Sequence, residues 1–173
     1  MPKLKPIPIQ TKNQKGFLRK IVVFVTQVRK WELVDNWTYK LNDDITLVIE
    51  KGFRFDGASI PRIFWAILNP TGLLLIPGLI HDYGYRYDQI WRLEGNNEVS
   101  VFGKGKGKAY WDNLFMKVGD DVNRVGLINL IAKLGVVWGG ATAWKKHRNN
   151  TDQKPKRPVF AEQDIQCCCC RIS

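Results

Sequence analysis

Cysteine is missing from almost the whole chain. The four cysteines form a single run, Cys167–Cys170, near the end of the 173 residues. A disulfide framework inside the folded part is therefore excluded, and the fold does not depend on an oxidising compartment. The cysteine run follows basic residues, and three interpretations of it stay open: a lipid-attachment site, a metal-binding run, or a disordered or artefactual end.

Long apolar runs are also scarce. The first ten residues, M-P-K-L-K-P-I-P-I-Q, lack the apolar core that a signal peptide requires. The most apolar stretch is Val125–Trp144, and Lys133 stands near its middle. A charge at that position is costly in a bilayer, so the stretch favours a buried helix over a membrane span.

Acidic residues are too few to balance the basic ones. Lys and Arg number 27 against 16 Asp and Glu, which gives a net charge of +11. A basic surface of this kind favours anionic partners such as lipid head groups, nucleic acid or an acidic protein. No nucleic-acid-binding motif accompanies the charge, so nucleic acid is not indicated.

The hydrophobic pattern predicts strands first and helices afterwards. Strands are expected in Phe17–Val28, Trp31–Tyr39 and Ile45–Ile49, which would form a small antiparallel sheet. Helices are expected after Pro61, in Leu73–Tyr87 from about Pro77, in Lys108–Val122 and in Leu127–Trp144, with a flexible polar loop over Trp91–Gly107. This order indicates the α+β class and contains no βαβ repeat.

Three segments follow from this pattern. Residues 1–16 are expected to form a basic extended arm. Residues 17–144 would make one α+β domain, with its sheet in 17–50 and a helical core of about three helices in 53–144. Residues 145–173 would form a basic, disordered tail that carries the cysteine cluster.

The residues best suited to chemistry surround His81, one of only two histidines. On a helix, Tyr85 shares the face of His81, and Asp82 is turned away by about 100°. Asp112 stands on the following helix. If the two helices pack antiparallel, Asp112 can accept a hydrogen bond from one imidazole nitrogen and leave the other to take a proton from water.

An upstream turn adds a second carboxylate. Asp56 precedes Gly57 there and can meet Asp82 at a hard cation. Two carboxylates and loop carbonyls are an oxygen set suited to Ca²⁺. Such an ion would polarise an ester carbonyl while His81 activates water. The alternative is a purely structural network, in which His81 pairs with Asp112 and holds a loop without catalysis.

The run I-H-D-Y-G-Y-R-Y-D, residues 80–88, resembles the catalytic-helix signature of phospholipases A2, and is closest to their small bacterial and fungal type. An Asp-containing turn precedes it and an Asp-bearing helix, A-Y-W-D-N-L-F, follows it. The resemblance implies a phospholipase-A2-like helical core. It makes His81 the general base and Asp112 its orienting partner, with Tyr85 in support. It also implies that Asp82, Asp56 and a carbonyl near Gly57 bind Ca²⁺.

Residues 52–140 also resemble a widespread, uncharacterised family of phage and prophage proteins. Its pattern G-F-x-x-D-x-A-S-x-P appears here as G-F-R-F-D-G-A-S-I-P, followed by H-D-x-x-Y. This resemblance implies a location in the virion or the host cell, in its cytoplasm or envelope. The expected partners are a phospholipid membrane surface or other virion proteins. Two functions stay open: Ca²⁺-dependent phospholipid hydrolysis during entry or lysis, and a non-catalytic virion or tail docking protein.

Overall fold

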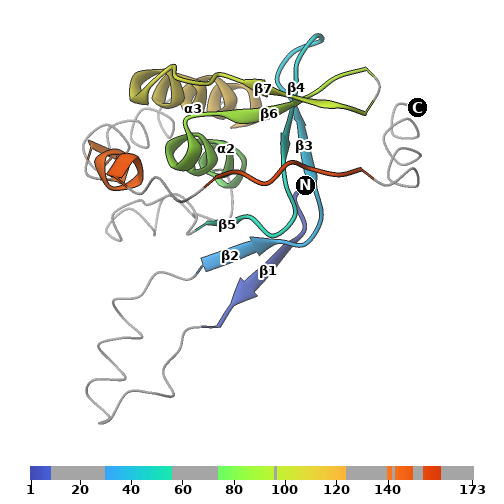
Figure 1. The fold of residues 1–173 in the computed structure, drawn as a ribbon, viewed down its shortest axis with the longest axis horizontal. Coiled ribbons are helices and arrows are strands. Elements are labelled where there is room, and N and C mark those ends of the chain that lie inside the picture. Colours follow the sequence, from blue (N-terminus) through green and yellow to red (C-terminus); the bar gives the residue numbers. More distant parts are fainter. Residues whose placement is uncertain are drawn as a thin grey trace.

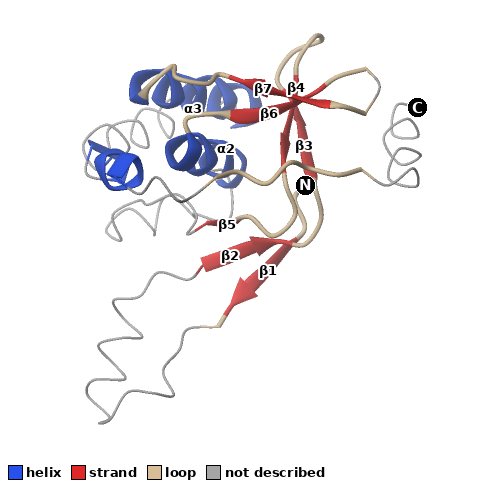
Figure 2. Cartoon of the chain, viewed as in Figure 1, coloured by secondary structure: helices blue, strands red, loops and turns tan. Residues whose placement is uncertain are grey.

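The chain has an α+β fold, as its sequence predicts, and Figure 1 shows it in a computed structural model. The structure describes residues 1–8, 30–55, 74–95, 97–123, 140–141, 143–149 and 154–160. Within these ranges the strands form two antiparallel sheets, and helix α2 lies between strands of both (Figure 2). The predicted strand Phe17–Val28 and the predicted short helix after Pro61 fall outside the described residues.

The smaller sheet has the strand order β1-β2-β5, formed by Leu4–Ile7, Lys30–Leu33 and Arg54–Phe55. Within the predicted extended arm of residues 1–16, Leu4–Ile7 form strand β1, and residues 9–16 lie outside the described ranges. The proline of β1, Pro6, pairs opposite Trp31 of β2. Because β1 lies at the edge of the sheet, proline's missing N–H removes no bond to a further strand. Leu4 packs against the core and fixes the strand there.

The larger sheet has the order β3-β4-β6-β7, formed by Trp37–Lys40, Thr46–Ile49, Ile90–Leu93 and Val99–Phe102. The single strand predicted over Trp31–Tyr39 is therefore wrong, because β2 and β3 belong to different sheets. Asn36 explains the break between them. Its side-chain oxygen accepts a hydrogen bond from the Lys51 backbone N–H at 2.8 Å, and its amide donates to the Val159 carbonyl at 2.7 Å.

The predicted flexible loop over Trp91–Gly107 is also wrong, because most of it forms the β6–β7 hairpin. The two strands pair in antiparallel register, with Leu93 opposite Val99. Glu94 donates its backbone N–H to the Glu98 carbonyl at 2.8 Å and so closes the turn. Ile90 and Val99 are the buried residues that anchor the two strands. The polar residues and glycines of this stretch, which are typical of loops, led to the wrong prediction.

Two helices follow the sequence prediction closely. Helix α2 covers Leu75–Tyr87 and helix α3 covers Lys108–Asn123. They pack against each other, and α2 also contacts β5 and β6 (Figure 1). Among the described residues, no helix is long and apolar enough to cross a membrane. Most of the predicted helix Leu127–Trp144 lies outside the described ranges.

The tail is more ordered than its composition predicts. Residues 143–149 are helical, and residues 154–160 run as an extended segment across the molecule (Figure 1). This segment is fixed at three points. Asn36 binds the Val159 carbonyl, the Lys156 N–H donates to Glu50 at 3.3 Å, and the Arg157 guanidinium donates to the Val99 carbonyl at 3.5 Å. The helical conformation of 145–149 and these contacts of 154–160 differ from the disorder predicted for the two stretches.

The core joins both sheets to the two helices. Its buried side chains come from every layer and include Leu33, Leu47, Ile49, Phe53, Phe55, Leu79, Ile80, Tyr83, Ile90, Trp111, Leu114 and Val118. Among the described residues, three acidic or basic side chains are buried with them: Glu50, His81 and Asp112. Because a buried charge is costly without partners, the surroundings of these three residues point to the functional parts of the molecule.

Candidate functional site

Helix α2 presents His81 and Tyr85 on the face that meets α3. They are four positions apart in the sequence, so their rings are neighbours on the helix surface, with centroids 3.9 Å apart. Phe115 of α3 packs edge-on against the imidazole, at 5.5 Å between centroids. The imidazole is therefore held between the two helices, and His81 is only 7% exposed.

A glycine allows the helices to approach this closely. The six-membered ring of Trp111, on α3, lies directly against the position that a β-carbon on Gly84 would occupy. Trp111 is fully buried, and Gly84 stands between Tyr83 and Tyr85 in the middle of the His81 motif. The glycine of the motif is thus required for helix packing, which brings α3 within reach of His81.

Asp112 is the centre of the site. Its Oδ1 lies 3.1 Å from His81 Nε2 and accepts a hydrogen bond from the Tyr85 hydroxyl at 2.5 Å. Its Oδ2 accepts a hydrogen bond from Lys108 Nζ at 2.6 Å. We call these four residues the Asp112 network. The structure therefore brings together the three residues that the sequence proposed as catalytic, His81, Asp112 and Tyr85.

The electrostatics of the network follow from burial and from its opposite charges. Burial by itself lowers the pKa of His81, but the neighbouring carboxylates of Asp112 and Asp82 outweigh it and raise that pKa above its ordinary value. Burial raises the pKa of Asp112, yet hydrogen bonds from His81, Lys108 and Tyr85 bring it below its ordinary value. The pair is therefore held as imidazolium and carboxylate over a wider pH range than isolated residues would be.

This pairing predicts how stability depends on pH. Because the pKa of His81 is raised on folding, the stability it contributes is fully present below pH 6.5, its ordinary value, and is lost as the pH rises through the raised pKa. Relative to His81→Gln, the unfolding free energy of the wild type should fall above pH 6.5, by up to about 1.4 kcal/mol per pH unit. Urea unfolding of both proteins between about pH 5.5 and pH 9 measures this difference, and a difference that stays constant would contradict it.

Lys108 is the member of the network that the sequence analysis missed. It opens α3 four residues before Asp112, and that spacing places a cation beside a carboxylate on a helix surface. The same spacing rule that linked His81 to Tyr85 would have found it. Lys108 Nζ also lies 5.8 Å from the centre of the Tyr85 ring, so it contacts the network on two sides.

The predicted metal ligands are only partly within the described residues. Asp82 lies on α2, with its Oδ1 4.0 Å from His81 Nδ1, the nitrogen that faces away from Asp112. Asp56 and Gly57 fall outside the described ranges. Within those ranges no group of three or more His, Cys, Asp or Glu side chains is placed to hold a metal ion. The described residues thus supply one of the proposed Ca²⁺ ligands.

A helical segment from the far end of the chain borders the site. At Gly140 an added β-carbon would meet the Tyr85 hydroxyl, and the Trp144 ring packs edge-on against Tyr85 at 5.3 Å. Arg148 donates to the carbonyls of Tyr85 and Arg86 at 3.0 and 2.7 Å. A cation there stabilises the carbonyl end of α2. No local pattern in the sequence indicates these long-range contacts.

Asp88 joins the end of α2 to the start of α3. It ends the helix in a left-handed conformation, and its Oδ1 accepts hydrogen bonds from Trp111 Nε1 at 2.8 Å and from the Gly107 N–H at 3.2 Å. Its carbonyl accepts from the Gly105 N–H at 3.1 Å. Gly105 and Gly107 have φ values of 72° and 79°, which glycine adopts readily. Asp88 therefore orders the Gly/Lys turn before α3.

Comparison with known proteins gives one match. Residues 31–123, more than half of the chain, match the family described as "Protein of unknown function (DUF1353)". No curated protein and no solved structure matches the chain. The matched range begins in β2, ends with α3 and contains the whole Asp112 network. The chain therefore belongs to the DUF1353 family, whose function is unknown.

Proposed function

We propose that His81 is the general base of an ester hydrolase of the phospholipase A2 type, in a phage or prophage protein that acts on phospholipid during entry or lysis. One observation carries the proposal. His81 Nε2 is paired with Asp112 at 3.1 Å, so in neutral His81 this nitrogen carries the proton and Nδ1 keeps its lone pair. Nδ1 points away from the network, toward Asp82. It is the atom that would take a proton from a water molecule.

The other members of the network have positioning roles in this proposal. Asp112 fixes the tautomer of His81 and would stabilise the imidazolium that forms when the proton is taken. Tyr85 and Lys108 hold the two oxygens of Asp112, so its carboxylate cannot rotate away from the imidazole. In this arrangement His81 is the base and Asp112 is the group that orients it, as in enzymes whose base is held by a third residue. The net charge of +11 supports a negatively charged membrane as the surface that the protein meets.

Ca²⁺ is part of the proposal as a bound cofactor. The residues assigned to it are Asp82, Asp56 and a carbonyl near Gly57, and bound Ca²⁺ would polarise the ester carbonyl. Ca²⁺ takes about six to eight oxygen ligands. Asp82 alone does not make such a site, so the roles of His81 and Asp112 are derived without the ion.

The expected activity is Ca²⁺-dependent release of fatty acid from vesicles of phosphatidylglycerol and phosphatidylcholine. His81→Gln should reduce the rate by about 10²- to 10⁴-fold, the range attributed to a general base. Tyr85→Phe should reduce it less, because Asp112 keeps its other partners. The wild-type rate should rise with pH through the raised pKa of His81, since only the neutral imidazole can accept a proton.

A tyrosine outside the network provides the matched control. The Tyr39 hydroxyl donates to Asp121 at 2.7 Å, so Tyr39→Phe also removes a phenol–carboxylate hydrogen bond. Its rate should equal that of the wild type. Wild-type protein that releases no fatty acid with Ca²⁺ present, or a His81→Gln variant as active as Tyr39→Phe, would rule the proposal out.

The burial of His81 favours a second function, a non-catalytic virion or tail docking protein. The imidazole is enclosed by the rings of Tyr85 and Phe115, and its raised pKa favours the charged form, which cannot act as a base. In this case the network only joins α2 to α3. The protein should then be found in purified virus particles, and His81→Gln should lower its stability while particles still assemble and infect.

A further inference from the structure

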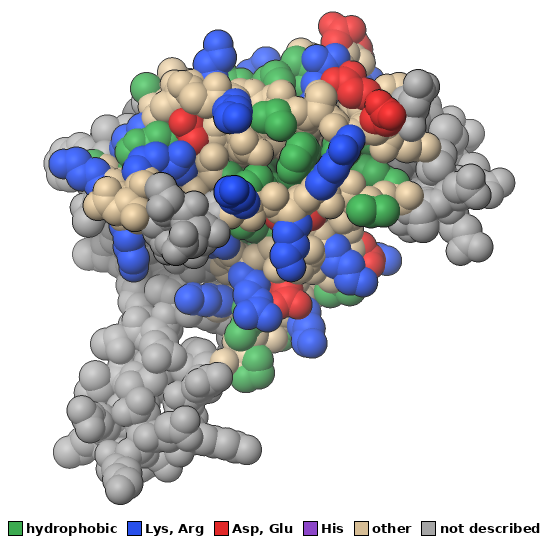
Figure 3. Space-filling view, in the orientation of Figure 1, with side chains coloured by type: hydrophobic (Ala, Val, Ile, Leu, Met, Phe, Trp, Pro, Cys, Tyr) green, Lys and Arg blue, Asp and Glu red, His purple; other side chains and the backbone are tan. Residues whose placement is uncertain are grey.

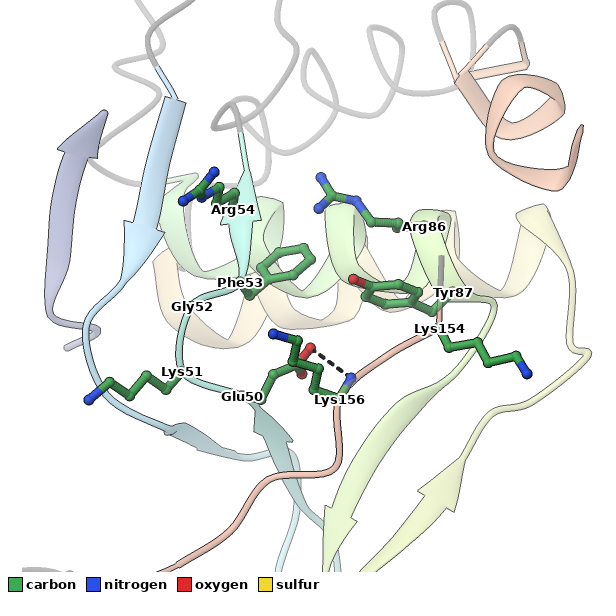
Figure 4. Close-up of a pocket in the computed structure, with 9 residues that line it drawn as sticks. All are labelled: Glu50, Lys51, Gly52, Phe53, Arg54, Arg86, Tyr87, Lys154 and Lys156. Carbon is green, nitrogen blue, oxygen red and sulfur yellow. Dashed lines mark hydrogen bonds between the residues drawn. The ribbon is translucent and has the colours of Figure 1, made fainter. Parts of the chain in front are cut away.

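A second buried ionisable residue, Glu50, leads to a pocket away from the Asp112 network. The pocket has a volume of about 170 Å³ and lies between the β4–β5 connection, the last turn of α2 and the segment 154–160 (Figure 4). Its lining residues are Glu50, Lys51, Gly52, Phe53, Arg54, Arg86, Tyr87, Lys154 and Lys156. Segments distant in sequence thus meet around one small cavity.

Positive charge dominates this pocket. Five of its lining side chains are cations and one is a carboxylate. In Figure 4, Arg86 and Lys156 lie close to Phe53, whereas Lys51 and Lys154 extend outward on opposite sides. Of the five, Arg54 is partly neutralised, because its Nε binds Glu32 on β2 at 2.6 Å. Figure 3 shows Lys and Arg side chains spread over the face of the molecule that segment 154–160 crosses in Figure 1.

The one carboxylate in the pocket, Glu50, cannot neutralise the four remaining cations. One of its oxygens accepts a hydrogen bond from the Tyr83 hydroxyl at 2.6 Å, and the other accepts from the Lys156 N–H at 3.3 Å. Burial raises the pKa of Glu50, against the effect of these hydrogen bonds. Glu50 therefore carries less negative charge at a given pH than an exposed glutamate would, and its oxygens hold segment 154–160 in place.

Arg86 carries a hydrogen-bond donor that no described residue satisfies. Its guanidinium stacks over the Phe53 ring, with Cζ 4.7 Å from the ring centre. Its Nε is buried and has no hydrogen-bond partner among the described residues. Buried donors are rarely left unpaired. A guanidinium is well matched to an oxyanion, because its planar fork of donors can bind two oxygens at once.

We propose that this pocket binds a phosphate group, through Arg86 and Lys156 at its centre and Lys51 and Lys154 at its rim. The volume is below the roughly 300–1,000 Å³ of sites for drug-sized ligands, so it suits a small anion or a head group. The phosphate can belong to a soluble ion or to a lipid head group, and the chemistry of the site is the same for both.

The phosphate site is separate from the Asp112 network. His81 and Tyr85 face α3, whereas Tyr83 binds Glu50, and Arg86 and Tyr87 line the pocket. One face of helix α2 therefore contributes to the Asp112 network, and another face lines the phosphate pocket. The phosphate proposal does not depend on hydrolysis, and His81→Gln should bind phosphate as the wild type does.

Calorimetric titration of the full chain with inorganic phosphate tests the proposal. Arg86→Gln should weaken binding by about ten- to a hundredfold, the loss expected for a charge-assisted hydrogen bond. Lys156→Gln should also weaken it, and because the Lys156 side chain is exposed, this second variant is expected to fold as the wild type does. Lys117→Gln removes an equal charge from an exposed position on α3 and should leave binding unchanged.

A second arm separates the two sources of phosphate. Phosphatidylcholine vesicles carrying phosphatidic acid are compared with vesicles of equal charge carrying oleate. Binding of inorganic phosphate that both pocket variants weaken supports a soluble ligand. Preference for phosphatidic acid that both variants abolish, without binding of the free ion, supports a head group. Equal binding by the pocket variants and Lys117→Gln, or no binding in either arm, would overturn the proposal.

Discussion

Replacing Asp112 with alanine is expected to lower the free energy of unfolding by about 3–5 kcal/mol, the cost of removing one partner from a buried ion pair. Asp112 is 7% exposed and accepts from three side chains. Its removal leaves His81 and the Tyr85 hydroxyl buried without their acceptor, and Lys108 without its ion pair. Urea unfolding of the two proteins at pH 6 to 7 measures the loss, provided that the m-value stays the same.

Asp43 provides the matched control for this variant. It also pairs with a lysine, Lys40, at 2.8 Å, but its side chain is 96% exposed. Water already solvates both charges, so Asp43→Ala should leave the stability close to that of the wild type. If Asp112→Ala were as stable as Asp43→Ala, the Asp112 network would not be what joins α2 to α3.

Gly84→Ala is expected to destabilise the protein by about 1–3 kcal/mol or more, the range for overpacking a core. Alanine favours a helix over glycine by about 1 kcal/mol, so the clash must exceed this gain. It should do so, because the new methyl group would overlap the ring of Trp111, which is fully buried and held by its hydrogen bond to Asp88. Neither the ring nor the helix backbone can move without disturbing the site.

Thermal and urea unfolding of Gly84→Ala should be compared with those of Gly95→Ala. Gly95 lies in the β6–β7 turn, where an added β-carbon would meet no atom within 4 Å. That variant should be as stable as the wild type or slightly more stable, because alanine restricts the unfolded chain. A Gly84→Ala protein of equal stability would show that α2 and α3 are not packed as closely as Gly84 and Trp111 indicate.

The helices and their contact at the site were predictable because the signals are local. The spacing of His81 and Tyr85 places them on one face, and the pattern of α3 places Asp112 toward its apolar side. The bounds of α2 and α3 agree with the prediction to within a few residues. The catalytic and Ca²⁺-binding roles of these residues stay predictions, because they depend on chemistry that the fold does not test.

The sheets and the phosphate pocket were not predictable in the same way. The break between β2 and β3 depends on Asn36, whose partners lie 15 and 123 positions away. In the sequence, Glu50 looks like an ordinary polar residue at the end of a strand. Its role in the pocket depends on hydrogen bonds to Tyr83 and to segment 154–160, which are distant in the sequence. A basic tail is typical of disorder by composition, but segment 154–160 is held by hydrogen bonds to the distant residues Glu50, Asn36 and Val99.

Asp88 has a consequence for how this fold can vary in length. Because it binds Trp111 and the turn before α3, the chain leaves α2 and returns to α3 through one fixed point. The β6–β7 hairpin connects the end of α2 to the start of α3. Lengthening such a connection adds little to the entropy cost of closing it. Residues inserted at the tip of the hairpin, near Gly95, would therefore extend the molecule outward. The distance in space between the side chains of His81 and Asp112 would stay the same.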